Sequence, residues 1–236
     1  MSKWGPVAGL MAVGLVALGL AGWALAPKPV EDSSFDVAHA PIETTVAGQE
    51  RAAFIGDSYS HGTGASASEN RWTTLVSKSK GWVEQNLALG GTGYVKTAGI
   101  NGCGLEFCDN YDGVVLSTPE LSVDTFFVAG GQNDFALWRT DSAAVTAAID
   151  KTYDDLRAQY PGATIIAVGP STVGEVGTTA IAFDSAVQNA AARVGATYVS
   201  LIDPNVIAPD MITEDGGHVQ DAGHRAIADR VLATIE

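Results

Sequence analysis

Basic residues are scarce in this sequence. Lys and Arg number 13 against 27 Asp and Glu, which gives a formal net charge of −14 at pH 7 over 236 residues. Lys78 and Lys80 form the densest basic pair, and they are too few to bind the phosphates of nucleic acid or anionic lipid headgroups. The composition therefore excludes nucleic acid as a partner and favours a soluble, extracellular-type surface.

Cysteine is nearly absent as well, with only Cys103 and Cys108, both in a Gly-rich stretch. In an oxidising compartment we expect the two thiols to form a disulfide, and so short a loop gives about 2 kcal/mol in the chain-entropy model. The alternative is a metal site, but two thiols without a neighbouring His or a further Cys are a poor ligand set. We therefore favour a disulfide and expect no metal.

A long apolar run lies near the N-terminus. Residues 7–26 contain no charged or strongly polar side chain, and a helix of that length crosses about 30 Å of hydrocarbon. Lys3 precedes this run and acidic residues follow it, so the positive-inside rule places the rest of the chain outside the cytoplasm. Residues 24–26 resemble a signal-peptide cleavage site, whereas Pro27 directly after them favours a retained anchor.

These features divide the chain into three parts. Residues 1–26 are expected to be a membrane anchor or a signal peptide, and residues 27–50, which carry Pro, Asp, Glu and Thr without a sustained apolar period, a tether. Residues 51–236 show no internal repeat, and with 46% hydrophobic residues in the chain they can bury the core of one domain. We therefore expect an extracytoplasmic domain, either membrane-anchored or secreted.

After Arg51, apolar runs of strand length alternate with segments of helical period, a pattern typical of a parallel sheet covered on both faces. The sequence therefore predicts an α/β fold, a three-layer α/β/α sandwich with a mostly five-stranded parallel sheet of the flavodoxin-like kind. Its ligand sites are expected at the carboxyl ends of the strands. The predicted strands are 52–55, 83–89, 125–129, 164–168 and 197–201, and helical spacing is clearest over 145–160, 181–194 and 221–236.

Small polar residues follow several of these strands. Gly56-Asp57-Ser58 comes directly after the first strand, which makes Ser58 a candidate nucleophile. Each glycine-rich stretch alone is weak, because turns after strands often contain glycine, but the order and placement of four such stretches indicate one site. The other three are Gly90-Gly91-Thr92-Gly93, Gly130-Gly131-Gln132-Asn133-Asp134 and Asp215-Gly216-Gly217-His218.

In this order the four stretches resemble the SGNH, or GDSL-type, hydrolase family, over essentially all of residues 51–236. The resemblance implies hydrolysis of esters or thioesters by a serine mechanism that needs neither a metal nor an organic cofactor. It implies Ser58 as nucleophile, His218 as base and Asp215 as the residue that orients the base. It also implies an oxyanion hole formed by the N–H groups of Ser58 and Gly91 and by the side chain of Asn133.

Nucleophilic catalysis by a serine requires the same residue types. A serine hydroxyl is a poor nucleophile until a neighbouring imidazole, whose pKa lies near neutrality, accepts its proton. A carboxylate that accepts the other ring N–H fixes the tautomer, and Asp215 precedes His218 by three residues. Asp57 has a structural explanation instead, because its side chain can bind the N–H groups of its own turn.

Two further histidines compete for the role of base. Asp221 and His224 repeat the Asp-x-x-His spacing, but His224 shares the apolar face of the last helix and Asp221 stands where an N-cap belongs. His61 lies three residues after Ser58, in what reads as a solvated turn. We favour His218 and keep both others as alternatives.

The expected function is that of an extracytoplasmic serine esterase. An acyltransferase that excludes water from the second step would use the same residues, and a catalytically silent binding module of the cell envelope is the alternative outside enzymes. Small-molecule, polysaccharide and lipid esters all remain open as substrates. Residues 94–121, with Phe107 and Tyr111, are expected to shape an acyl or sugar pocket, because they lie beyond the carboxyl ends of strands.

Overall fold

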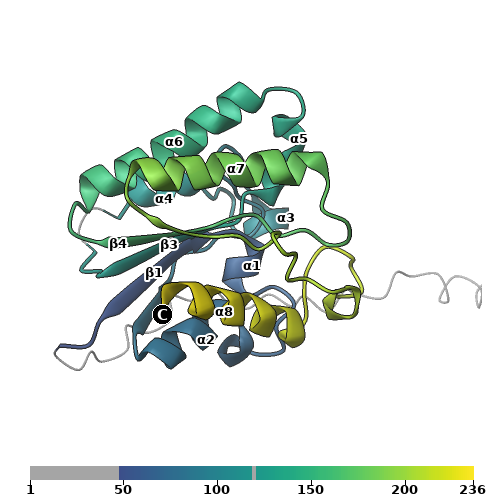
Figure 1. Cartoon of the computed structure of the whole chain (residues 1–236), viewed down its shortest axis with the longest axis horizontal. Coiled ribbons are helices and arrows are strands. Elements are labelled where there is room, and N and C mark those ends of the chain that lie inside the picture. The colour runs from purple at the N-terminus through teal and green to yellow at the C-terminus, as the bar shows by residue number, and fades with distance from the viewer. Residues whose placement is uncertain (1–47, 119–120) are drawn as a thin grey trace, which may run out of the picture. The chain divides into compact units, whose positions relative to one another are not determined.

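Five parallel strands form the centre of the domain, in the order β2-β1-β3-β4-β5 (Figure 1). This strand order is that of flavodoxin-like folds, so the predicted α/β class and the five-stranded parallel sheet are confirmed. Two strands end earlier than predicted, β2 before the Gly90-Gly91 turn and β5 before the loop that leads to the last helix. The strands are β1 (Arg51–Gly56), β2 (Val83–Asn86), β3 (Thr125–Ala129), β4 (Thr164–Val168) and β5 (Thr197–Val199).

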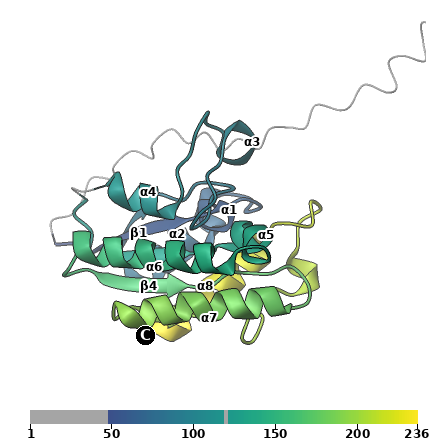
Figure 2. The same ribbon diagram turned by 90° about the horizontal axis from the view of Figure 1, so that it is seen from above.

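Helices cover both faces of this sheet (Figures 1 and 2). Side chains alternate along β1, so that Ala53 and Ile55 contribute to one core and Ala52 and Phe54 to the other. The first core is covered by α4 (Tyr111–Leu116), α6 (Ser142–Gln159) and α7 (Thr178–Arg193), and the second by α2 (Trp72–Lys80) and α8 (Asp221–Ile235). The three layers of the prediction are therefore present.

The longest helix shows how local sequence sets the elements. Asp141 precedes α6 and its carboxylate accepts a hydrogen bond from the Ala144 N–H, which satisfies one of the free donors of the first turn. Apolar residues at helical spacing, beginning with Val145 and Ile149, are fully buried against the sheet. The predicted helical face over 145–160 is thus confirmed.

The structure describes residues 48–118 and 121–236, and the computed structural model gives no description of the expected anchor at 1–26 or of residues 27–47. Within the described ranges no helix is long and apolar enough to cross a membrane. Gln49 and Glu50, which the sequence assigns to the tether, already contact the domain: the Gln49 side chain donates to the Gly81 carbonyl, and Glu50 accepts from the indole of Trp82.

After β1 the chain goes to β2 on one side of the sheet, and after β3 it goes to β4 on the other side. The crevice between these two connections is where such folds bind ligands. The chain leaves β1 directly into the short helix α1 (Ser58–His61), and leaves β3 into a turn at Gln132–Asp134 followed by α5 (Phe135–Trp138). Both glycine-rich stretches that follow these strands therefore lie at the same edge of the sheet.

Candidate active site

Ser58, His218 and Asp215 form one continuous chain of hydrogen bonds. The Nε2 atom of His218 lies 2.9 Å from Ser58 Oγ, and its Nδ1 atom lies 2.6 Å from Asp215 Oδ2. Ser58 is the first residue of α1, whereas the other two come from the loop before α8. The fold thus brings Ser58 into contact with His218, which lies 160 positions later in the sequence.

The surroundings of Asp215 decide which ring nitrogen of His218 carries the proton. Hydrogen bonds from the Thr213 hydroxyl, at 2.5 Å, from the His218 ring and from the Gly217 N–H hold the pKa of the Asp215 carboxyl well below its usual range. An ionised carboxylate can only accept, so Nδ1 of His218 is the protonated nitrogen. Nε2 therefore presents its lone pair to the Ser58 hydroxyl.

The loop that carries His218 is braced at both ends and in its middle. Ile212 and Val219 form an antiparallel bridge at its base, and Val219 is fully buried. The Tyr59 hydroxyl donates to the Gly217 carbonyl over 3.0 Å. Sequence reasoning did not find Tyr59 or Thr213, although each stands within two residues of a predicted site residue.

Asp57 connects the turn after β1 with the loop after β3. Its buried carboxylate accepts hydrogen bonds from the Tyr59 N–H, the Tyr111 hydroxyl and, more weakly at 3.4 Å, the Gly131 N–H. Burial raises the pKa of Asp57 to about 6. This is the structural role expected from the sequence.

Tyr111 corrects one expectation. The sequence places it beside Phe107 in an acyl or sugar pocket, but its ring is fully buried, and its hydroxyl lies 3.1 Å from Asp57 Oδ2 and from the Ala129 carbonyl oxygen. Tyr111 begins α4, a six-residue helix that packs on β1 and α6. It therefore belongs to the core and cannot line a pocket, whereas Phe107 is exposed.

Asn133 and Asp134 fix the loop that carries Gly91. The Asn133 side-chain amide donates to the Thr92 carbonyl over 2.9 Å. The buried Asp134 carboxylate accepts from the backbone N–H groups of Tyr94 and Lys96. Two adjacent residues after β3 thus anchor both halves of one loop.

Two of the predicted oxyanion donors are free for a ligand. Among the described residues, no acceptor is hydrogen-bonded to the N–H of Ser58 or of Gly91. Gly91 has φ +76°, a left-handed conformation that favours glycine, and a Cβ there would lie 3.3 Å from the Cα of Gly102. Both N–H groups therefore stay available for the predicted role, which is donation to a developing oxyanion.

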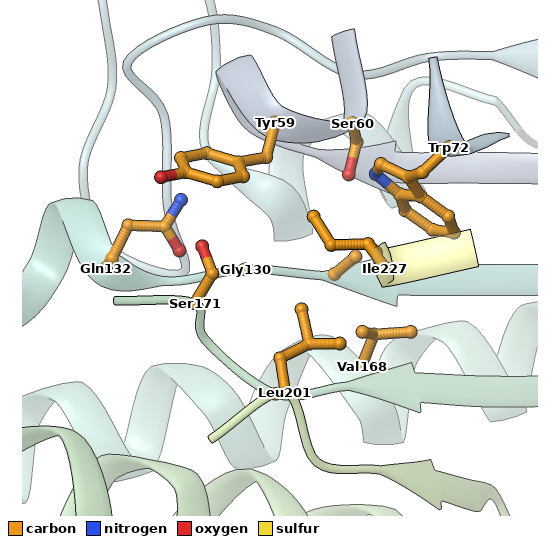
Figure 3. Close-up of a pocket in the computed structure, with 11 residues that line it drawn as sticks. Tyr59, Ser60, Trp72, Gly130, Gln132, Val168, Ser171, Leu201 and Ile227 are labelled. Carbon is orange, nitrogen blue, oxygen red and sulfur yellow. The ribbon is translucent and has the colours of Figure 1, made fainter. Parts of the chain in front are cut away.

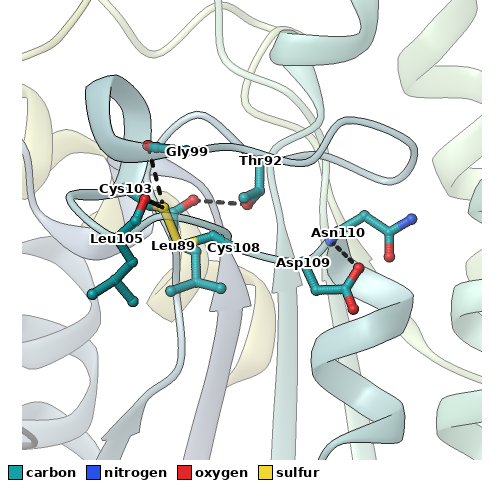
Figure 4. Close-up of a disulfide and its surroundings, with 8 residues drawn as sticks. All are labelled: Leu89, Thr92, Gly99, Cys103, Leu105, Cys108, Asp109 and Asn110. Carbon is teal, nitrogen blue, oxygen red and sulfur yellow. Dashed lines mark hydrogen bonds between the residues drawn. A yellow bond between two sulfur atoms is a disulfide. The ribbon is translucent and has the colours of Figure 1, made fainter.

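Cys103 and Cys108 form the expected disulfide (Figure 4). It ties residues 103–108 to the end of α3 (Ile100–Cys103), and α3 itself packs against Gly90: a Cβ on Gly90 would lie 2.5 Å from the Gly102 carbonyl oxygen. The disulfide therefore lies next to the loop of Gly91, a contact that the sequence did not predict.

The two competing histidines are placed elsewhere. His224 is fully buried, its Nε2 lies 3.2 Å from the Thr63 carbonyl oxygen, and burial lowers its pKa. Asp221 is the first residue of α8 rather than its cap, and its carboxylate accepts from the backbone and hydroxyl of Ser66. His61 ends α1 and has no hydrogen bond to Ser58. The structure does not bring these side chains to Ser58.

A small pocket lies under the turn that carries the nucleophile (Figure 3). Tyr59, Gln132 and Ser171 lie at its polar end, and Trp72 and Ile227 lie at its apolar end. Ser58 is not among its lining residues. Its cavity volume is about 10 Å³, which is room for about one water molecule.

A flavodoxin-like sheet with Ser, His and Asp hydrogen-bonded at its carboxyl edge defines a hydrolase of the SGNH class. The chain belongs to the GDSL-like lipase/acylhydrolase family, whose profile matches residues 54–226. This confirms the resemblance seen in the sequence and makes the protein a member of a family of esterases and lipases.

Known proteins give the same result. A GDSL lipase of Mycobacterium tuberculosis is 26% identical over 192 residues, which cover 78% of this chain and 80% of the relative. Phospholipase A1 from Streptomyces albidoflavus has a TM-score of 0.58 at 14% identity, over 79% of this chain and 99% of its own. A two-domain esterase active on acetylated mannans has a TM-score of 0.59 at 19% identity, over 80% of this chain and 50% of its own. The two structures show the shared fold.

Proposed function

We propose that this protein is an extracytoplasmic serine esterase that cleaves carboxylic esters or thioesters through an acyl-enzyme on Ser58. The observation that carries the proposal is the hydrogen-bonded chain from Ser58 Oγ through the His218 ring to Asp215, at 2.9 and 2.6 Å. Membership of the GDSL-like lipase/acylhydrolase family supports it, because ester cleavage through an acyl-enzyme requires an activated nucleophile such as Ser58.

In this mechanism Ser58 Oγ attacks the ester carbonyl while its proton passes to Nε2 of His218. Asp215 stabilises the resulting imidazolium, and the N–H groups of Ser58 and Gly91 with the Asn133 amide donate to the oxyanion. The imidazolium then gives its proton to the leaving alcohol or thiol, and the acyl group stays on Ser58. Water repeats the two steps, releases the acid and restores the serine.

The cellular setting is part of the proposal. The apolar segment 7–26, with Lys3 before it and acidic residues after it, supports a membrane anchor or a signal peptide that places the domain outside the cytoplasm. The disulfide between Cys103 and Cys108 is in keeping with an oxidising compartment. Small-molecule, lipid and polysaccharide esters are the substrate classes to test.

The test is hydrolysis of 4-nitrophenyl butyrate by the full chain. Ser58→Ala and His218→Gln should each lower turnover by about 10⁴-fold or more, because neither half of the nucleophile–base pair works alone. The matched variant His224→Gln keeps a donor for the Thr63 carbonyl and should retain turnover. A burst of nitrophenol equal to the enzyme concentration, with an acyl group on Ser58 by mass spectrometry, would report the acyl-enzyme.

Each other outcome has a definite meaning. Loss of turnover in His224→Gln but not in His218→Gln would overturn the assignment of the base. A burst followed by turnover that needs an added alcohol would identify an acyltransferase. A folded wild type that forms no acyl-enzyme with acetyl, butyryl or lauroyl esters would leave the binding module as the explanation.

A further inference from the structure

Large apolar side chains gather on the disulfide loop, defined here as residues 99–108. Among the described residues, six large hydrophobic side chains are strongly exposed, and three of them lie in this loop: Ile100 at 64%, Leu105 at 53% and Phe107 at 63%. Single exposed apolar residues are ordinary, but three on one ten-residue loop, here called the patch, are a concentration of the kind found at interaction surfaces.

The disulfide loop presents this patch in a fixed form. Cys103 is bonded to Cys108, and Ala98 and Cys108 exchange two backbone hydrogen bonds at its base. In Figure 2 the loop with α3 projects from the layered part of the domain. A preorganised loop loses little conformational entropy on binding. Because binding sites for single small molecules are concave, a projecting patch suits an extended apolar surface instead.

Position and charge indicate which surface. The loop packs on Gly90 through the Gly102 carbonyl, so a surface that touches it lies next to the proposed oxyanion loop. Glu106 is the one charged residue of the loop, in a chain of net charge −14. An anionic surface is therefore repelled, and one without net charge is favoured.

We propose that the disulfide loop docks on a lipid layer or ester droplet without net charge, with Ile100, Leu105 and Phe107 inserted among the acyl chains. Docking of this kind concentrates the protein at water-insoluble esters and holds Gly91 and Ser58 close to the surface. The inference rests on the proposed function for the identity of the substrate as an ester, whereas docking itself requires no turnover.

The direct test uses the full chain carrying Ser58→Ala, so that no ester is consumed. Phe107→Trp is compared with Leu116→Trp, a matched control at an equally apolar and 53% exposed position on α4. With phosphatidylcholine vesicles that carry brominated acyl chains, we expect the fluorescence quenching to be at least about twice as large for the first protein, since a tryptophan inserted among acyl chains meets the bromine. Both proteins share the same N-terminal segment, so the difference reports the loop. Equal quenching would overturn the proposal, and so would stronger binding to phosphatidylglycerol vesicles.

A kinetic test uses active protein. Replacing Ile100, Leu105 and Phe107 by Ser should lower turnover of emulsified tributyrin about tenfold more than turnover of dissolved 4-nitrophenyl acetate, because only the emulsified ester requires burial of these side chains in an apolar surface. Leu116→Ser should leave the ratio unchanged. An equal loss on both esters would count against docking. Quenching at position 107 in a wild type that hydrolyses no ester would overturn the proposed function and leave docking standing.

Discussion

At the scale of single residues, the protonation of Asp57, in the turn before Ser58, makes the stability of the fold depend on pH. Its native pKa of about 6 lies above the ordinary 3.8 because the carboxyl is fully buried. Between these values the native state retains a proton that the unfolded chain has lost. The stabilising contribution of Asp57 is therefore complete below about pH 4 and is lost as the pH rises through 6, a loss of about 3 kcal/mol.

Asp57→Asn removes this titration. We expect the free energy of unfolding of the variant, relative to wild type, to increase by about 2.5 kcal/mol between pH 4 and pH 7.5, whatever the constant offset from altered hydrogen bonds. Urea unfolding of both proteins across this range measures the difference. Asp229→Asn, on the exposed side of α8, supplies the control variant. A parallel curve for Asp57→Asn would show that the carboxyl titrates normally.

Asn133 tests the oxyanion assignment. Its amide already donates to the Thr92 carbonyl, so Asn133→Ala removes a preorganised donor and one loop contact. Loss of one oxyanion donor costs about 100- to 1000-fold in kcat, which steady-state hydrolysis of a chromogenic ester measures. The exposed Asn189→Ala serves as the control. A rise in KM with unchanged kcat would instead assign Asn133 to substrate binding.

Residues whose role follows from their type and their motif can be predicted from the sequence. Ser58, Asp215 and His218 were singled out by motif order, and the fold places them in hydrogen-bond contact. Tyr59 was not, because its role depends on Gly217, 158 positions away. Local reasoning made Asp221 a helix cap, whereas a tertiary contact to Ser66 takes its carboxylate.

At the scale of elements, prediction succeeded where burial is continuous. Strands β3 and β4 have the predicted bounds because they lie in the interior of the sheet with neighbours on both sides. The edge strand β2 was predicted too long, since its apolar run continues into a loop that leaves the ladder after Asn86. Helix α4 was missed because six residues are too few to show a helical period.

The contact between the disulfide loop and Gly90 yields a prediction at the same scale. Replacing Cys103 and Cys108 by Ser should lower the stability of the domain by about 2 kcal/mol, the entropy term for so short a loop. It should also lower kcat about tenfold, because the support behind the Gly91 loop becomes mobile and misplaced donors lose catalytic effect. Thermal unfolding and ester hydrolysis measure the two effects. Unchanged kcat in the double variant would separate the disulfide from the oxyanion loop.

At the scale of the whole molecule, the acidic composition limits how the protein can attach to a membrane. The domain that follows residue 50 belongs to a chain with 27 acidic and 13 basic residues, and this surface gains nothing from anionic headgroups. Stable attachment to a membrane must then come from apolar contacts. We propose two of them, the segment 7–26 and the disulfide loop.

Whether the segment 7–26 anchors the protein in a membrane can be tested by lowering its hydrophobicity. If it is a retained anchor, the full chain should sediment with membranes and its domain should be digested by protease added from the outer side. The double substitution Leu15→Arg with Leu18→Arg places two charges at the centre of the span. Each charge raises the free energy of membrane insertion by about 3 kcal/mol, so the protein should move to the soluble fraction. Replacing the same residues by Ala is the control, because it keeps the run uncharged. N-terminal sequencing distinguishes the alternatives: a chain that begins at Pro27 would identify a signal peptide, and protection from external protease would contradict the extracytoplasmic placement itself.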